Sequence, residues 1–156
     1  MNPYAPPEAK LADPAAAPGS PIKAVLLGLG VDIGGSVIAT LILAIAYGMY
    51  LGSTGASPEE IAVASARIPP DSWLFYASAA AGCAFSVLGG YVCARTAKRS
   101  EYTLGAILAV VSSAFGLWAA LDEYSLGTIL SLTLAGIGAV LFGARLGYLK
   151  NRGAPQ

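Results

Sequence analysis

The chain has 156 residues, of which 56% are hydrophobic and 12% are charged, and its mean hydropathy is +0.66. Soluble domains carry about 25% charged residues, so this composition predicts a membrane protein built around one apolar domain. The nine Lys and Arg residues balance the nine Asp and Glu residues and the chain has no His, which argues against a nucleic-acid partner and removes the commonest general base of enzymes.

Residues 1–21 contain six prolines among alanines and polar residues. Such a segment buries too little apolar area to offset the entropy that ordering would cost. We therefore expect a disordered tail at residues 1–21, a membrane domain at residues 22–150 and a short C-terminal tail at residues 151–156.

Four apolar segments are each long enough to cross a bilayer, which takes a helix of about 20 residues. Helices are required because hydrocarbon supplies no partner for free backbone N–H and C=O groups, and the segments lack the alternating pattern of barrel strands. The predicted spans lie at about 24–51, 73–94, 102–121 and 126–144. The expected fold class is all-α: a polytopic membrane protein with four transmembrane helices in an up-down bundle.

The first span holds one charged residue, Asp32, with Ser36 and Thr40 following at four-residue intervals. Residues four apart share a helix face, so the sequence predicts an inward-facing polar stripe. Two positions of Asp32 in the bilayer are possible. If the span begins at Ala24, Asp32 lies about 12 Å inside, where a bare carboxylate needs a partner, water or a proton. If residues 33–51 alone cross, Asp32 lies at the inner headgroup boundary.

Arg95, at the end of the second span, is the predicted partner of Asp32, because a long arginine side chain can reach several ångström into an apolar region. A boundary position or a structural ion pair is the favoured interpretation of Asp32. A proton or cation site is the alternative.

The segment between the first two spans has the features of a helix start. Ser57 suits the N-cap, Pro58 the first helical position, and Glu59 and Glu60 favour the positive helix N-terminus. We predict a short helix at about 58–66, acting as a spacer, with a docking element as the alternative.

Small residues recur every four positions in the second and fourth spans. In lipid, helix association depends on close backbone approach, which ridges of small residues permit. These faces serve contacts within one bundle, or with a second copy or a larger membrane partner. The predicted packing residues are Gly30, Gly34, Gly82, Ser86, Gly90, Gly127, Ser131, Ala135, Ala139 and Gly143.

Charges outside the spans predict the orientation, because Lys and Arg in short loops stay preferentially on the cytoplasmic side. Trp and Tyr residues, which prefer membrane interfaces, concentrate near both predicted boundaries and agree with the span assignments. Both termini are expected in the cytoplasm. The eight basic residues that share the cytoplasmic side are Lys10, Lys23, Arg95, Lys98, Arg99, Arg145, Lys150 and Arg152.

Recognisable catalytic and metal-binding patterns are missing from the sequence. Lone carboxylates and hydroxyls without His do not assemble a nucleophile, a base and an orienting group, so we do not expect an enzyme. Cys83 and Cys93 lie in one span and are interpreted as apolar fillers rather than metal ligands. We expect no cofactor and no metal.

Two motifs, DIGGS at 32–36 and LGGYVCAR at 88–95, anchor a resemblance that covers roughly residues 25–110. The chain resembles small uncharacterised bacterial inner-membrane proteins with four predicted spans. The resemblance implies a multi-pass protein of the bacterial cytoplasmic (inner) membrane and carries no activity over.

Two functions remain open. The favoured one is a structural or accessory protein that binds itself or a membrane partner through the small-residue faces, because it needs no chemistry beyond packing. The alternative is a small oligomeric transporter or ion-conducting protein in which Asp32, Ser36 and Thr40 line a path.

Overall fold

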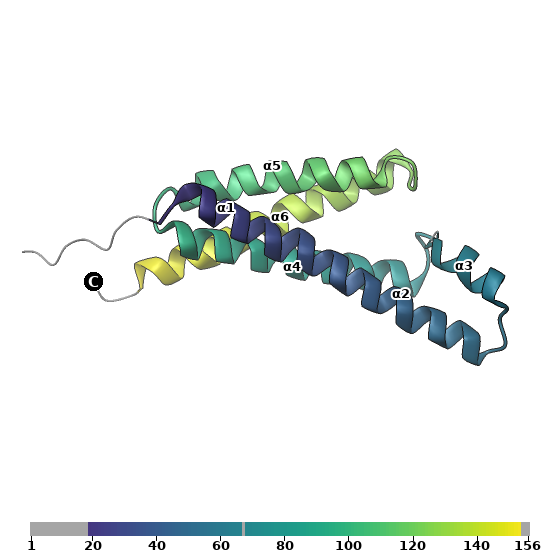
Figure 1. Ribbon diagram of the computed structural model, residues 1–156. Helices are drawn as coiled ribbons and strands as arrows, with labels where there is room; N and C mark the ends of the chain where they lie inside the picture. The colour runs from purple at the N-terminus through teal and green to yellow at the C-terminus, as the bar shows by residue number, and fades with distance from the viewer. Residues whose placement is uncertain (1–18, 67, 154–156) are drawn as a thin grey trace, which may run out of the picture.

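The computed structural model describes residues 19–66 and 68–153, and every regular element in these residues is helical (Figure 1). The elements in chain order are α1 (Pro21–Leu29), the π-helical turn η1 (Gly30–Gly34), α2 (Gly35–Ser53), α3 (Pro58–Ala66), α4 (Trp73–Ala97), α5 (Glu101–Ala120) and α6 (Leu126–Arg152). The segments α1, η1 and α2 run as one helix from Pro21 to Ser53.

Four helices in the described residues are long and apolar enough to cross a membrane: Pro21–Ser53, α4, α5 and α6. They form a bundle in which α4 packs against α6, α5 and the helix that contains α1 (Figure 1). The prediction of an all-α, four-helix membrane protein is confirmed.

Three of the four long helices begin at a serine that caps them. Ser20, Ser72 and Ser125 each have an extended backbone, and each hydroxyl accepts a hydrogen bond from the backbone N–H three residues later. A serine in this position satisfies an N–H group that the helix itself leaves without a partner. The starts of α1, α4 and α6 therefore follow directly from local sequence.

The largest difference between the predicted and observed helix ends is at the C-terminus of the chain. The fourth helix continues to Arg152, so that Asn151, predicted in a tail, belongs to α6. The Asn151 amide donates to the carbonyl oxygen of Ala94 over 3.0 Å and to Glu101 Oε1 over 3.3 Å, which ties α6 to α4 and α5. Most of the predicted N-terminal tail, residues 1–18, lies outside the described residues.

The predicted short helix between the first two spans is present as α3. Ser57 and Glu60 form a reciprocal cap, in which the Ser57 N–H donates to Glu60 Oε2 over 2.8 Å and the Glu60 N–H donates to Ser57 Oγ over 3.3 Å. Ile61 packs over Gly48 and Gly52 of α2. This contact sets α3 against the end of α2.

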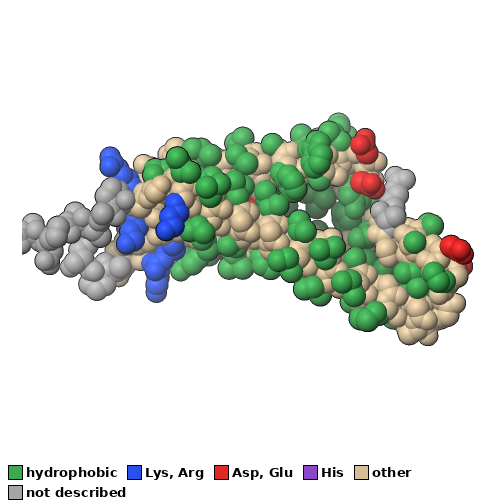
Figure 2. Space-filling model, in the orientation of Figure 1, with side chains coloured by type: hydrophobic (Ala, Val, Ile, Leu, Met, Phe, Trp, Pro, Cys, Tyr) green, Lys and Arg blue, Asp and Glu red, His purple; other side chains and the backbone are tan. Residues whose placement is uncertain are grey.

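Opposite charges gather at opposite ends of the bundle (Figure 2). The basic end contains Lys and Arg residues from the α4–α5 turn and the end of α6, and the acidic end contains α3 and the α5–α6 turn (Figures 1 and 2). The surface between the two ends is apolar, with large side chains such as Ile42 (61% exposed) and Leu134 (69% exposed) facing outward. A hydrocarbon environment accounts for such a surface, which water would disfavour.

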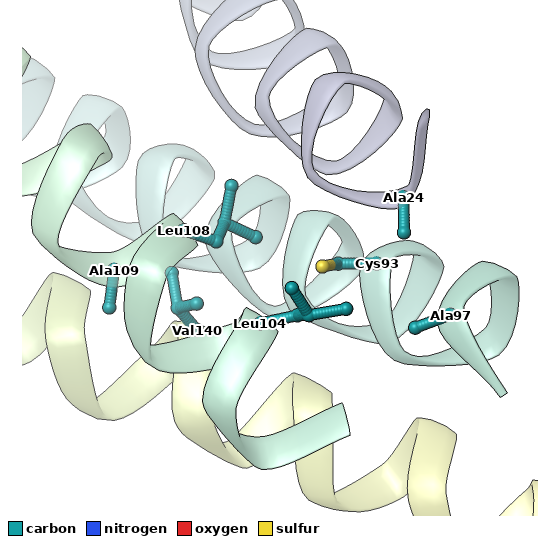
Figure 3. Close-up of a cluster of buried hydrophobic side chains, with 7 residues drawn as sticks. All are labelled: Ala24, Cys93, Ala97, Leu104, Leu108, Ala109 and Val140. Carbon is teal, nitrogen blue, oxygen red and sulfur yellow. The ribbon is translucent and has the colours of Figure 1, made fainter. Parts of the chain in front are cut away.

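A core of buried apolar side chains lies toward the basic end (Figure 3). It brings together α1, α4, α5 and α6, and most of its members are small. The core consists of Ala24, Cys93, Ala97, Leu104, Leu108, Ala109 and Val140.

Helices α4 and α6 approach closely along half of their small-residue faces. A Cβ atom on Gly90 would overlap the carbonyl oxygen of Val140, and one on Gly143 would overlap that of Val87. At Gly147 it would stand 2.7 Å from the Cβ of Ala94. The basic-end half of each face is therefore used within the bundle.

Toward the acidic end the same two faces no longer fit closely against each other. Gly82 and Gly127 have open space where a Cβ would be, and Ser131 and Ala135 are exposed. Figure 1 shows the reason: the α5–α6 hairpin diverges from α2 and α4 toward the acidic end. The predicted faces are continuous in sequence, but only half of each meets its neighbour.

Gly30 and Gly34 make no close contact within the bundle, because a Cβ at either position meets nothing within 4 Å. The close contacts fall at Gly28, opposite Cys93, and at Gly35, opposite Phe85. The helix face toward α4 runs through Gly28, Asp32 and Gly35, and positions two residues away along a helix point elsewhere.

Candidate functional site

Asp32 lies inside the bundle and is only 3% exposed. Ser86 Oγ of α4 donates a hydrogen bond to Asp32 Oδ1 over 2.7 Å, and Ser112 Oγ of α5 donates to Asp32 Oδ2. Three different helices thus meet at one carboxyl group, and each of its oxygens has a neutral hydroxyl partner.

The partners of Asp32 define its depth. Ser86 lies near the middle of α4, which has 25 residues, and Ser112 lies near the middle of α5, which has 20 residues. At 1.5 Å per residue, the two ends of α5 lie about 17 Å and about 12 Å from Ser112 along the axis. Asp32 is therefore level with the middle of the bundle, and the interpretation that placed it at the end of the apolar layer is wrong.

Glycines make room for the carboxyl group beside α4. A Cβ atom on Gly89 would stand 2.7 Å from the Cβ of Asp32 and 2.7 Å from the carbonyl oxygen of Gly28. Only a residue without a side chain fits there, so Gly89 permits the approach that brings Asp32 within reach of Ser86.

Asp32 also stands in the π-helical turn Gly30–Gly34. Single π-turns inside α-helices add one residue to a turn and occur frequently at functional sites. Gly30, Gly34 and Gly35 have low helix propensity, so the regular α-helical pattern is least favoured at this point of the first span.

The predicted pair between Asp32 and Arg95 is not formed. Arg95 is exposed near the basic end of α4, where its guanidinium donates to Asn151 Oδ1 over 3.4 Å. Arg95 lies more than two helical turns from Ser86, the residue of α4 that contacts Asp32, which is farther than its side chain reaches.

The predicted polar stripe is only partly inward-facing. Ser36 is half-buried, and Thr40 is exposed on the apolar outer surface. A four-residue repeat drifts by about 40° at each step because the helix turns 100° per residue, so after two steps Thr40 has left the packed face. Ala39 and Leu43 occupy that face instead.

Sequence reasoning missed Ser112 and assigned Ser86 only to packing. The adjacent pair Ser112–Ser113 is the polar signal within the third span that could have drawn attention to it. Nothing in the sequence pattern indicates which helix face of α5 turns toward Asp32, so the pairing emerges only in three dimensions.

A cavity of about 210 Å³ adjoins this site between α4, α5 and α6. Four of its lining residues carry hydroxyl groups: Ser86, Ser112, Ser113 and Thr133. The remaining lining residues are small or apolar: Ala109, Gly116, Ala120, Ile129, Leu132, Gly136 and Val140. A cavity of this size with several polar partners has room for more than one water molecule.

No cationic side chain pairs with Asp32 among the described residues, and within that part of the chain no group of three or more His, Cys, Asp or Glu residues is placed to hold a metal ion. The site is therefore one carboxyl group, two hydroxyl partners and an adjoining hydroxyl-lined cavity. Comparison with known protein families, curated proteins and solved structures finds no match for the chain.

Proposed function

We propose that Asp32 binds and releases a proton within the membrane, and that the protein is a small proton-conducting or proton-coupled transport protein. The observation that carries the proposal is a mid-bundle carboxyl group, 3% exposed, whose hydrogen-bond partners are two neutral hydroxyls. Ionisable residues inside membrane spans are costly and commonly mark proton or ion pathways.

The hydrogen bonds of the site suit a group that binds and releases a proton. Ser86 and Ser112 suit both states of Asp32. A hydroxyl donates to the ionised carboxylate, and by rotating its O–H bond it accepts from the protonated one.

A proton fits the site better than a metal ion does. Hard cations such as Ca²⁺ and Mg²⁺ take about six or more oxygen ligands. Asp32 supplies one carboxyl group and its two serine partners supply one oxygen each. These three side chains supply fewer oxygens than such a cation takes, whereas one carboxyl oxygen is enough to hold a proton.

We place the protein in the bacterial cytoplasmic membrane with the basic end in the cytoplasm. The gathering of Lys and Arg at one end of the bundle supports this orientation through the preference of basic residues for the cytoplasmic side. The resemblance carried by DIGGS and LGGYVCAR supports the bacterial membrane.

The test is proton flux in liposomes that contain the purified protein and a trapped pH-sensitive dye. A potassium gradient with valinomycin supplies the driving potential. We expect flux above protein-free liposomes, and we expect Asp32→Asn to abolish it, because the amide keeps the shape of the side chain but cannot exchange a proton. Glu59→Gln, the corresponding loss of a carboxylate on the exposed helix α3, should leave flux unchanged. Normal flux in a folded Asp32→Asn variant would reject the proposal.

A second candidate function is association through α6. Its acidic-end half presents Gly127, Ser131 and Ala135 on an exposed face, and the Ser131 hydroxyl is satisfied by the carbonyl oxygen of Gly127 in its own helix. A helix face with small side chains and no unpaired hydroxyl suits close contact with another membrane helix. We propose a second copy of this chain as the partner. Native mass spectrometry tests this: multiples of 15.7 kDa support self-association, and a foreign subunit would instead indicate an accessory protein.

A further inference from the structure

We propose that the cavity beside Ser86 and Ser112 is a water-filled access route that joins Asp32 to the acidic end of the bundle. The inference rests on the proposed function, because it assigns the side of the membrane from which protons reach Asp32. This route forms the acidic-end half of a proton pathway, and the basic-end half is closed in this conformation.

The cavity and the carboxyl site share two residues. Ser86 and Ser112 line the cavity and also donate to the two carboxyl oxygens of Asp32. Ser113 and Thr133 add hydroxyls to the same cavity from α5 and α6. Water in the cavity can therefore form hydrogen bonds along its wall and reach the groups that contact Asp32.

Three of the other wall residues give the cavity its direction. Gly116, Ala120 and Ile129 come from the halves of α5 and α6 that lead to the α5–α6 turn at the acidic end. Figure 1 shows this hairpin diverging from α2 and α4 over the same half of the bundle. The cavity thus extends from the level of Asp32 toward the acidic end.

The opposite side of Asp32 is closed by packing. Leu108 and Cys93 are fully buried, and a Cβ atom on Gly28 would stand 2.9 Å from the Cβ of Cys93 and 3.0 Å from Cδ2 of Leu108. Ala24 and Ala97 continue this dry core toward the basic end (Figure 3). The basic-end side of the site is therefore packed shut in this conformation, and transfer to the basic end requires the core to move.

Cysteine accessibility tests the route without relying on flux. In a background with Cys83→Ala and Cys93→Ala, single variants Ser113→Cys and Thr133→Cys place a thiol in the cavity wall. The matched control is Leu134→Cys, which neighbours Thr133 at the same depth but is 69% exposed on the apolar outer surface. A charged, membrane-impermeant thiosulfonate reagent is applied to each face of oriented vesicles, and modification is counted by mass.

We expect the thiols at positions 113 and 133 to react from the acidic-end face, and the thiol at 134 to stay unmodified because thiolates react in water and not in hydrocarbon. Thiols at 113 and 133 that react no faster than the one at 134 would overturn the access route and indicate a cavity filled by lipid. Reaction only from the basic-end face would overturn its direction.

The two proposals fail separately. If Asp32→Asn conducts normally while the cavity thiols react, the proton function is wrong and a water-filled cavity remains. If Asp32→Asn loses flux while the cavity thiols stay unmodified, the proton function stands and protons reach Asp32 by another path. Elution of each variant as one species on size exclusion establishes that it is folded.

Discussion

Gly89 of α4 lies directly against Asp32, so that a Cβ atom on Gly89 would stand 2.7 Å from the Cβ of Asp32. We predict that Gly89→Ala pushes α4 and the first helix apart and weakens the Ser86–Asp32 hydrogen bond. Forcing a methyl group into such a contact costs about 1–3 kcal/mol. Both the unfolding midpoint in detergent and the proton flux should fall.

Gly82→Ala is the matched control, because it makes the same change in the same helix where the new Cβ meets nothing within 4 Å. Alanine has the higher helix propensity, by up to about 1 kcal/mol, so this variant should unfold at an equal or higher midpoint. If Gly89→Ala behaves like Gly82→Ala, the close contact does not determine the geometry of the site.

The contact between α4 and α6 makes a separate prediction. A methyl group at Gly143 would overlap the backbone carbonyl of Val87, which cannot rotate away as a side chain can. Gly143→Ala should therefore destabilise the protein by about 1–3 kcal/mol. Gly138→Ala, in open space on the same helix, should not. Denaturant titration in mixed micelles compares the two, and equal midpoints would show that this crossing contributes little to stability.

The sequence predicts those features of the structure that are determined by residues close together in the chain. The spans and α3 follow from apolar length, serine caps and the Ser57–Glu60 pair, and all of these act within a few residues of one another. The packing of Gly90 and Gly143 follows from the small-residue repeat. Apolar length, the helix at about 58–66 and the small-residue repeat can be read along the chain without any tertiary arrangement.

The Asp32 site was not predictable in the same way. Ser86 and Ser112 lie 54 and 80 residues from Asp32 in the chain, and their pairing depends on how the helices rotate and splay. The prediction of Arg95 depends on the reach of a long side chain, but the depth of Asp32 puts Arg95 beyond that reach. The predicted polar stripe does not extend to Thr40, because the 100° turn per residue and the π-turn decide which side chains of the first helix face inward.

Ser86 and Ser112 should stabilise the fold through their hydrogen bonds to Asp32. We predict that Ser86→Ala and Ser112→Ala each lower stability by about 0.5–1.5 kcal/mol, the usual net value of one hydrogen bond. The same substitutions should cost less in an Asp32→Leu background, where the acceptor is gone. Thermal unfolding of the single and double variants forms a double-mutant cycle. Identical costs in both backgrounds would show that the serines act elsewhere.

The turn between α4 and α5 holds two residues in the left-handed region, Lys98 at φ 52° and Ser100 at φ 54°. A side chain in this conformation costs roughly 1–2 kcal/mol, which glycine avoids. Lys98→Gly should therefore be more stable than Lys98→Ala by about 1 kcal/mol, since both lose the lysine charge and only glycine relieves the backbone. Equal unfolding midpoints for the two variants would contradict this account.

The start of α3 should loosen in acid. The pKa of the Glu60 carboxyl lies below its ordinary value of 4.5, because its carboxylate accepts a hydrogen bond from the Ser57 backbone N–H and interacts with the Ser57 hydroxyl. A carboxyl group whose pKa is lowered by folding contributes stability above the ordinary pKa, and that contribution is lost as pH falls through the folded value. The cap should therefore be intact above pH 4.5 and weaken progressively below it.

Amide hydrogen exchange at Ser57 and Glu60, corrected for the intrinsic effect of pH, measures the opening of this cap. Exchange should accelerate below pH 4.5 in the native protein and become independent of pH in Glu60→Gln, whose neutral amide oxygen still accepts from Ser57 but does not titrate. Glu59→Gln, the neighbouring change outside the reciprocal pair, should keep the native pH profile. Acid loosening that persists in Glu60→Gln would assign the titration to another group.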